Sequence, residues 1–318
     1  MSDTTSETVI PVDASAATDR ESWLALIDQI AEEEGYLQTV GDRHWAMFVD
    51  DSPTLLVTFE TIDQARTRDG QMPLAHYVAA ANGWSHLCLI ADGQTWFRDP
   101  AVYAYFDRLV DDSFFEDFDR VLFYGAGISA YAACALAVAA PGAQILALSP
   151  IATANPAQTS WDDRFPPARK LDFTSRYGYA PDMVEGCAAM TVITDPRVKH
   201  DAMHAALFRA PYITQLTARF AGGDLEAALI RMGILTDLIR LATDGKLTPA
   251  AYATLWRIRR HDPLYLRTLL QATDTKAHLD RAIKLCTSVN RRMKISRIQK
   301  RLAELTISQT DPERSNAT

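Results

Sequence analysis

The chain has 318 residues and a mass of 35.3 kDa, and its 40 acidic and 32 basic residues give a formal net charge of −8. Hydrophobic residues make up 48% of it and charged residues 23%, which is typical of a globular protein and excludes a collagen-like, fibrous or wholly disordered chain. A chain of this length can bury a hydrophobic core without disulfides or metal ions, as one large domain or two unequal ones.

Most of the chain is predicted to consist of short strands separated by helices. An amphipathic run after Asp19 predicts a first helix that ends near Gly35. Compact apolar runs predict strands at residues 44–49, 55–59, 84–90, 121–124, 145–148, 190–194 and 212–216. Helices are predicted between them at residues 73–81, 102–110, 129–140, 200–208 and 225–241. Apolar strands separated by helices are typical of a parallel sheet covered on both faces, so we predict a doubly wound α/β domain.

The remaining segments are predicted as an appendix and two tails. Residues 1–18 are acidic and rich in Ser and Thr, without the basic segment and apolar core of a secretory signal, so we expect a disordered tail. The α/β domain is expected over residues 19–247. From residue 248 to 306 the apolar spacing is helical, which predicts a basic helical appendix, and residues 307–318 are expected to be a frayed tail.

The charge is distributed unevenly along the chain. Residues 1–120 contain 23 acidic and 7 basic residues, whereas residues 256–301 contain 13 basic and 3 acidic ones. Such asymmetry indicates either solvated helix faces that pair internally or an interaction module built on the basic helices. No zinc finger or aromatic-basic RNA motif accompanies the basic residues, and the overall charge is negative, so nucleic acid is an unlikely partner. A small molecule or a protein is expected instead.

The sequence also indicates a compartment and the state of its thiols. No segment approaches the ~20 apolar residues of a membrane span. There is no CxxC motif and no Cys/His cluster, so we expect buried reduced thiols in a cytoplasmic protein, at Cys88, Cys134, Cys187 and Cys286. Aromatic neighbours predict partly buried histidines with satisfied hydrogen bonds at His44, His76 and His86.

A glycine-rich turn in the middle of the chain gives the clearest chemical signal. Residues 121–141 read VLFYGAGISAYAACALAVAAP, an apolar strand that runs through Gly125 into an Ala-rich helix. A sharp strand–turn–helix is the setting of a nucleophile elbow, in which the helix N-terminus faces a developing oxyanion. The segment resembles the α/β-hydrolase family, in a bacterial branch with the pattern Tyr-Gly-x-Ser-x-Gly-Gly-Tyr-Ala-Ala. The residues that match are Tyr124, Gly125, Tyr131, Ala132 and Ala133.

The resemblance implies an α/β-hydrolase-like, mostly parallel sheet with a C-terminal helical appendix, but two functional positions depart from the family. The nucleophile position falls on Gly127, within a degenerate elbow formed by Gly125, Ala126, Gly127 and Ile128. The family's histidine is expected just before Leu225, where this chain has none. Without a nucleophile and a base, serine hydrolysis cannot run. The resemblance therefore implies a non-catalytic homologue with a binding or regulatory role, and we predict no cofactor and no metal.

A second register of the turn stays open. If the turn shifts by two residues, Ser129 is the nucleophile of an active hydrolase or acyl-transferase, with His200 or His204 as the base. Asp195 and Asp201 are then the candidates for the acid. The alternative is structural: both aspartates are loop or helix-capping residues, and Asp201 pairs with His204 on one face of a helix.

Two other interpretations lack part of their motif. Gly125, Gly127 and Ala130 fit a dinucleotide-binding turn, but the next strand ends in Ser149-Pro150 rather than in an acid for a ribose. Bacterial proteins that resemble this chain often carry the label phosphoadenosine phosphosulfate reductase. That chemistry needs a Ser-Gly-Gly-rich phosphate loop and a reactive cysteine near the C-terminus, whereas Cys286 lies in a basic helical run. We therefore judge the label a misannotation.

Overall fold

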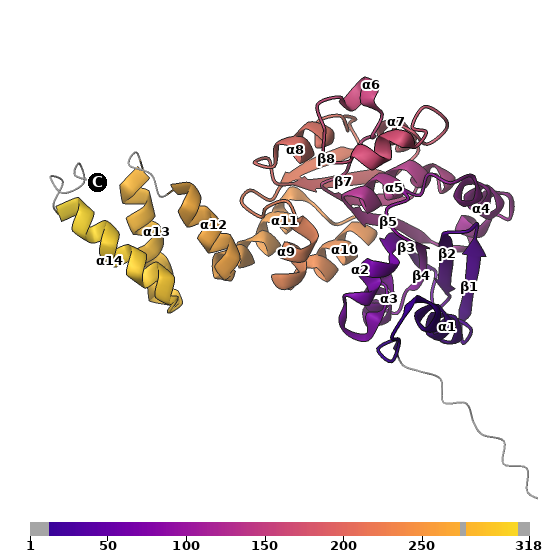
Figure 1. Cartoon of the computed structure of the whole chain (residues 1–318), viewed down its shortest axis with the longest axis horizontal. Helices are drawn as coiled ribbons and strands as arrows, with labels where there is room; N and C mark the ends of the chain where they lie inside the picture. Colours follow the sequence, from indigo (N-terminus) through magenta and orange to yellow (C-terminus); the bar gives the residue numbers. More distant parts are fainter. Residues whose placement is uncertain (1–12, 274–277, 311–318) are drawn as a thin grey trace, which may run out of the picture.

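The computed structural model describes residues 13–273 and 278–310, and these build one eight-stranded sheet flanked by helices (Figure 1). The sheet order is β1-β2-β4-β3-β5-β6-β7-β8. The strands are β1 (Gly35–Val40), β2 (His44–Val49), β3 (Thr54–Thr61), β4 (Ser85–Ala91), β5 (Arg120–Ala126), β6 (Gln144–Leu148), β7 (Ala189–Thr194) and β8 (Ile213–Thr217). β2 runs antiparallel to both of its neighbours, and all other neighbouring pairs are parallel. The predicted mostly parallel sheet is confirmed.

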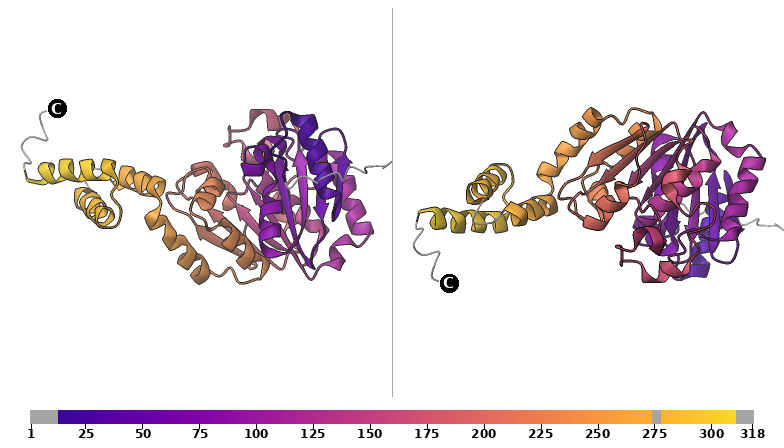
Figure 2. Two further views of the ribbon diagram at one scale, coloured as in Figure 1. Left: turned by 90° about the horizontal axis from the view of Figure 1, so that it is seen from below. Right: turned by 90° about the horizontal axis from the view of Figure 1, so that it is seen from above.

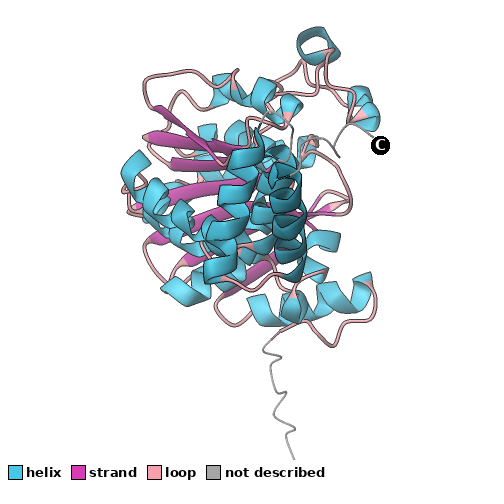
Figure 3. Ribbon diagram, turned by 90° about the vertical axis from the view of Figure 1, so that its left-hand side faces the viewer, coloured by secondary structure: helices cyan, strands magenta, loops and turns pink. Residues whose placement is uncertain are grey.

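Helices cover both faces of the sheet, and Figure 3 shows them in cyan around the magenta strands. The helices before β7 are α1 (Arg20–Ala31), α2 (Ile62–Arg66), α3 (Leu74–Asn82), α4 (Pro100–Asp111), α5 (Ile128–Leu136), α6 (Pro156–Thr159) and α7 (Ala180–Met183). Those after it are α8 (Lys199–Ala205), α9 (Leu225–Arg231), α10 (Leu235–Thr243), α11 (Pro249–Leu255), α12 (Pro263–Thr273), α13 (Leu279–Arg292) and α14 (Ser296–Thr310). The central strands are apolar on both faces because each face is buried: in β5, Leu122 packs into one core and Phe123 into the other.

The C-terminal helices form an arm that projects from the sheet (Figures 1 and 2). α11 still packs on the sheet, because the Tyr252 hydroxyl donates to the carbonyl of Thr217 at 3.0 Å. At the root of the arm, Arg231 pairs with Asp262 at 2.8 Å. Beyond it, α12, α13 and α14 pack mainly on one another, around buried residues such as Cys286 and Ile298. No helix within the described ranges is long and apolar enough to cross a membrane.

Several details differ from the sequence-based expectations. β1 was not predicted, because an edge strand with Gln38 and Thr39 lacks an apolar run. The helix expected over 225–241 is two helices, since Gly233 adopts φ 68° and ends α9. Residues 13–18, expected in the disordered tail, pack on the fold through the Ala14 N–H, which donates to Gly70 O at 2.9 Å. α14 continues to Thr310, so residues 307–310 are helical rather than frayed, and residues 1–12 and 311–318 lie outside the described ranges.

Candidate functional site

The turn between β5 and α5 has the backbone of a sharp strand-to-helix elbow. Gly127 adopts φ 58° and ψ −115°, a conformation that strongly favours glycine. Its N–H donates to Leu148 O at 2.9 Å, and its carbonyl accepts the N–H of Tyr131 at 3.1 Å as the helix begins. No side chain caps the N-terminus of α5. Gly127 is therefore the residue at the tip of the turn, and it presents no side chain there.

The two glycines of the elbow are required for different reasons. A Cβ at Gly125 would lie 2.4 Å from the carbonyl carbon and oxygen of Ser129, so the strand and the first turn of α5 can approach only because Gly125 lacks one. A Cβ at Gly127 would meet no atom within 4 Å. Gly127 is thus needed for its backbone conformation alone, and the space in front of it is open.

Two adjoining cavities flank the elbow, and we call them together the elbow cleft. A cavity of about 380 Å³ is lined by Gly127, Ser149, Arg164 and Glu226, among others, and a cavity of about 300 Å³ is lined by Trp96 and Ser129, among others. Gln64, Ala126 and Ile128 border both. Open space at the carboxyl ends of parallel strands is where α/β proteins bind ligands. Ser149, 6% exposed, adds a hydroxyl without a hydrogen-bond partner to this lining.

Ser129 borders the cleft, but the structure does not pair it with a histidine. It is the second residue of α5 and is buried. Nδ1 of His204 accepts the N–H of Ala152 at 3.2 Å, and Nε2 of His204 lies 2.9 Å from Oδ2 of Asp162. Nδ1 of His200 lies 3.8 Å from Oδ1 of the same aspartate. Both ring nitrogens of His204 are therefore occupied by hydrogen bonds to groups other than Ser129.

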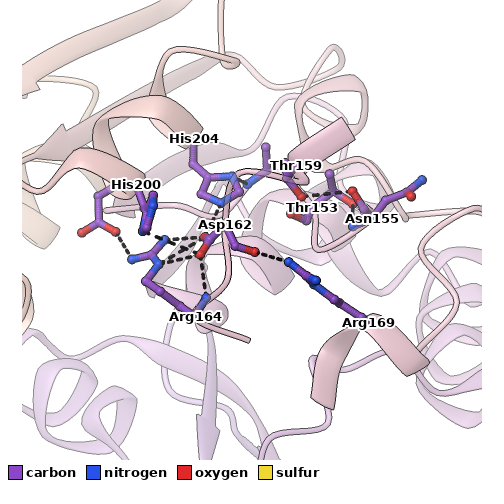
Figure 4. A network of polar contacts seen from close by, with 10 residues as sticks. Thr153, Asn155, Thr159, Asp162, Arg164, Arg169, His200 and His204 are labelled. Atoms are coloured by element: carbon purple, nitrogen blue, oxygen red, sulfur yellow. Dashed lines mark hydrogen bonds and ion pairs between the residues drawn. The ribbon is translucent and has the colours of Figure 1, made fainter. Parts of the chain in front are cut away.

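Figure 4 shows what these histidines do instead: they join α8 to the segment between β6 and β7. Because Nδ1 of His204 accepts from a backbone N–H, its proton is on Nε2, which donates to Asp162. Arg164 also donates to Asp162, at 2.8 Å, and to Asp201, at 2.5 Å. The expected pairing of Asp201 with His204 is therefore wrong, because Arg164 reaches between the two segments and takes Asp201 as its partner.

Burial and charge set the protonation states of this network. Burial lowers the pKa of His204, which favours the neutral ring that the Ala152 contact requires. Burial alone would raise the pKa of Asp162, but hydrogen bonds from Arg164 and His204 outweigh it and hold the pKa below its usual range. The network therefore pairs a neutral His204 with an ionised Asp162 beside the guanidinium of Arg164.

Asp195 and Asp201 both have structural partners, and of the two only Asp201 is among the residues that line the cleft. Asp195 follows β7, where its two carboxylate oxygens accept the N–H groups of Arg197 and Gly222, each at 2.9 Å. It thereby ties the loop after β7 to the loop after β8, the loop in which the family's histidine is expected. That loop, residues 218–224, reads ARFAGGD. Asp201 is the third residue of α8 and does not cap it.

A cluster of buried polar side chains lies behind the elbow. The Tyr124 hydroxyl donates to Oε1 of Glu226 at 2.5 Å, and Arg68 pairs with Glu60. Oε1 of Glu60 also accepts the N–H of Leu74 at 2.7 Å. Burial raises the pKa of both glutamates, and each is partly offset by the Arg68 charge. Glu226 borders the cleft as well as this cluster, so it is the carboxyl group with a raised pKa that a ligand can contact.

One group of side chains has the spacing of metal ligands. Ligand atoms of Asp162, Asp163 and His200 lie within 4.8 Å of one another. The carboxylate of Asp162 already accepts hydrogen bonds from Arg164 and His204, so a cation would have to displace a guanidinium. These residues therefore do not fit a metal as they stand.

The sequence did not reveal several residues of the cleft. Gln64 lies after β3, Arg164 lies between β6 and β7, and Glu226 is the second residue of α9. Gln64 is the last residue of a capping box with Thr61, and the other two belong to no motif. The three come together because the ends of parallel strands meet at one edge of the sheet. The run Trp161-Asp162-Asp163-Arg164, a dense charge cluster soon after a strand, was the one available signal.

Comparison with known proteins finds similarity at the level of structure. No protein-family model and no curated protein matches the chain. Among solved structures, an esterase domain from Rhodothermus marinus aligns at 14% identity and TM-score 0.42, over 64% of this chain and 94% of that one. An S-formylglutathione hydrolase from Agrobacterium tumefaciens aligns at 12% identity and TM-score 0.45, over 65% and 91%. The glycosylation-associated Gap123 complex from Streptococcus agalactiae aligns at 16% identity and TM-score 0.47, over 67% of this chain and 47% of that one.

The fold class follows from the topology itself. The strand order, the antiparallel β2, the elbow after β5 and helices on both faces are those of an α/β-hydrolase-like sheet. The α/β-hydrolase-like fold with C-terminal helices is therefore confirmed. Fold alone does not assign a function, which has to be inferred from the side chains of the cleft.

Proposed function

We propose that this protein is a non-catalytic α/β-hydrolase homologue that binds a small molecule in the elbow cleft. The observation that supports this most directly is Gly127, which holds the tip of the elbow with φ 58° and offers no nucleophile. The reaction of serine hydrolases needs a nucleophile activated by a base that is itself oriented by an acid. Here the tip has no side chain, and the loop after β8 has no histidine.

The cleft has polar and apolar groups that could bind a ligand, but it has no nucleophile and base that could cleave one. The uncapped N-terminus of α5 and the unpartnered hydroxyl of Ser149 offer hydrogen bonds, and Gln64 and Glu226 add polar groups. Trp96 and Phe165 supply apolar surface. A cavity that combines apolar walls with a few polar groups is the usual form of a small-molecule site.

Two measurements on the full-length protein test the absence of catalysis. A fluorophosphonate probe is expected to leave the protein unlabelled, and no turnover is expected with a panel of esters, thioesters and acylated sugars. Ser129→Ala serves as the control for any residual signal. Stoichiometric labelling of Ser129, with turnover that the alanine variant loses, would instead establish the second register, an active hydrolase or acyl-transferase.

Ligand binding is tested by thermal stabilisation with the same panel. A ligand at a hundred times its dissociation constant stabilises by about 2.7 kcal/mol, which raises Tm by several degrees. Gly127→Phe places a ring in the cleft and is expected to abolish the shift. Gly142→Phe is the matched control, because Gly142 also has a positive φ and open space around it but does not border the cleft. A shift that survives in Gly127→Phe, or no shift with any compound, would contradict the proposal.

A further inference from the structure

A further cavity lies at the β1 edge of the sheet, away from the elbow. It has a volume of about 510 Å³ and lies between β1, β2, α4 and the short helix Phe114–Asp117. Its aromatic lining is Tyr36, Phe48, Tyr105, Phe114 and Phe118, and its acidic lining is Asp50, Asp112 and Asp117. We call this cavity the acidic groove.

The chemistry of the acidic groove suits a guanidinium or ammonium group. Aromatic faces attract cations through their quadrupoles, and nearby carboxylates add charge. The groove already shows this preference, because the Arg108 guanidinium lies 5.4 Å from the Tyr105 ring centroid. Asp112 and Asp117 are exposed and pair with no cation of the described chain. Two carboxylates at its rim are therefore available to further cations.

The C-terminal arm presents the complementary charge. Its last two described helices and their connection, residues 278–306, contain two acidic residues, Asp280 and Glu304, and eight basic ones: Arg281, Lys284, Arg291, Arg292, Lys294, Arg297, Lys300 and Arg301. Of these, Arg291, Lys294 and Arg297 are exposed and form no ion pair with a described residue. An arm surface of this kind carries a high density of unpaired positive charge.

The groove and the arm of one chain point away from each other. The groove lies at β1, one edge of the sheet, whereas the arm leaves the molecule beyond β8, the opposite edge. Figures 1 and 2 show the arm extending away from the sheet, on the side opposite to α4 and β1. The arm therefore cannot reach the groove of its own chain.

We propose that the acidic groove binds the basic helices α13 and α14 of a second copy of this chain. The contact joins two different surfaces, so it is head-to-tail and leaves a free groove at one end and a free arm at the other. Copies then add in a row or close into a ring. Because opposite charges drive the contact, it strengthens at low ionic strength and weakens as salt screens the charges. This self-association is independent of the ligand proposed for the elbow cleft.

Sedimentation velocity and light scattering on the full-length protein test the proposal. At low salt, about 20 mM, the average mass is expected to rise with protein concentration above the 35.3 kDa of one chain, and to return to it near 0.5 M salt. Asp112→Lys with Asp117→Lys, or Arg291→Glu with Arg297→Glu, should each raise the dissociation constant at least about tenfold. Asp182→Lys on α7 with Glu185→Lys just after it is the matched control and should change little, because neither acid has an ion-pair partner in the described chain.

The two charge reversals can also be combined. The combination distinguishes a variant that has lost the contact from a variant that has misfolded. Placing both reversals in one chain, or mixing the groove variant with the arm variant, restores opposite charges and should return the dissociation constant to within about threefold of the original. A chain that stays monomeric at low salt up to about 1 mM would overturn the proposal. So would association that only the arm variant weakens, because the arm would then bind a surface other than the groove.

Discussion

Alanine substitutions at Gly125 and Gly127 test the elbow geometry directly, because the same added methyl group meets different surroundings two residues apart. At Gly125 it would lie 2.4 Å from the carbonyl group of Ser129 and 2.6 Å from the backbone nitrogen of Ala130. At Gly127 it would meet nothing within 4 Å, but the residue has φ 58°. Gly125→Ala therefore creates a clash, and Gly127→Ala creates only backbone strain.

The expected magnitudes follow from these distances. Real Cβ atoms essentially never approach closer than 3.0 Å, so at Gly125 strand and helix must separate by at least 0.6 Å. Overpacking of a core costs ~1–3 kcal/mol, and we expect about 3 kcal/mol or more here because both partners are backbone. At Gly127 an alanine would be held at φ 58° and ψ −115°, a sparsely populated backbone region, which costs ~1–3 kcal/mol. With 2–4 °C per kcal/mol, the losses in Tm are about 6–12 °C or more for Gly125→Ala and about 2–12 °C for Gly127→Ala.

Thermal and urea unfolding followed by circular dichroism measure both variants in the same buffer. The conversion from free energy to Tm is the same for both, so the ordering decides the outcome. Gly125→Ala must lose more of the free energy of unfolding than Gly127→Ala. Equal losses, or a larger loss at Gly127, would refute the close approach of β5 and α5 described above.

Three further predictions concern residues outside the elbow. His86 is buried with neither ring nitrogen hydrogen-bonded, and burial lowers its pKa to about 3. Below pH ~6.5 the unfolded state therefore takes up a proton that the folded state does not. The free energy of unfolding then falls by ~1.4 kcal/mol for each unit by which the pH is lowered. His86→Leu should flatten this slope by that amount in urea titrations from pH 7 to 4, and an unchanged slope would contradict it. His204→Ala removes one hydrogen bond from Asp162 and leaves the Ala152 N–H without a partner, so it should cost about 3 kcal/mol by urea unfolding. His200→Ala should cost less than about 1 kcal/mol, because its contact to Asp162 is 3.8 Å, and similar losses for the two variants would count against the network. A chain ending at Asp262 keeps the Tyr252 and Arg231 contacts, and its Tm should lie within a few degrees of that of the full chain. A chain ending at Leu247 loses buried Tyr252 and Trp256, and its Tm should be clearly lower by scanning calorimetry. Equal Tm values for the two shortened chains would show that α11 adds nothing to the stability of the fold.

The sequence predicted the central part of the fold because its local signals agree with its burial. β3, β5, β6 and β7 are buried on both faces, so each appears as a compact apolar run. β1 was not predicted, because an edge strand is only partly buried and does not need a compact apolar run. The expectation of satisfied histidines was wrong for His86, whose burial between β2 and β3 leaves both ring nitrogens unbonded.

The sequence by itself determined the chemical content of the elbow. Gly125, Gly127 and the absence of histidine from residues 218–224 are fixed by residue identity, and the strand–turn–helix around them follows from a local pattern. Only the tertiary structure decided the partners of the polar side chains. Asp162 meets His204 across 42 residues, and Tyr124 meets Glu226 across 102, because strand order rather than sequence spacing brings loop ends together. The tertiary structure likewise places the acidic groove and the basic arm at opposite edges of one sheet. The spacing of these residues along the chain does not indicate that placement.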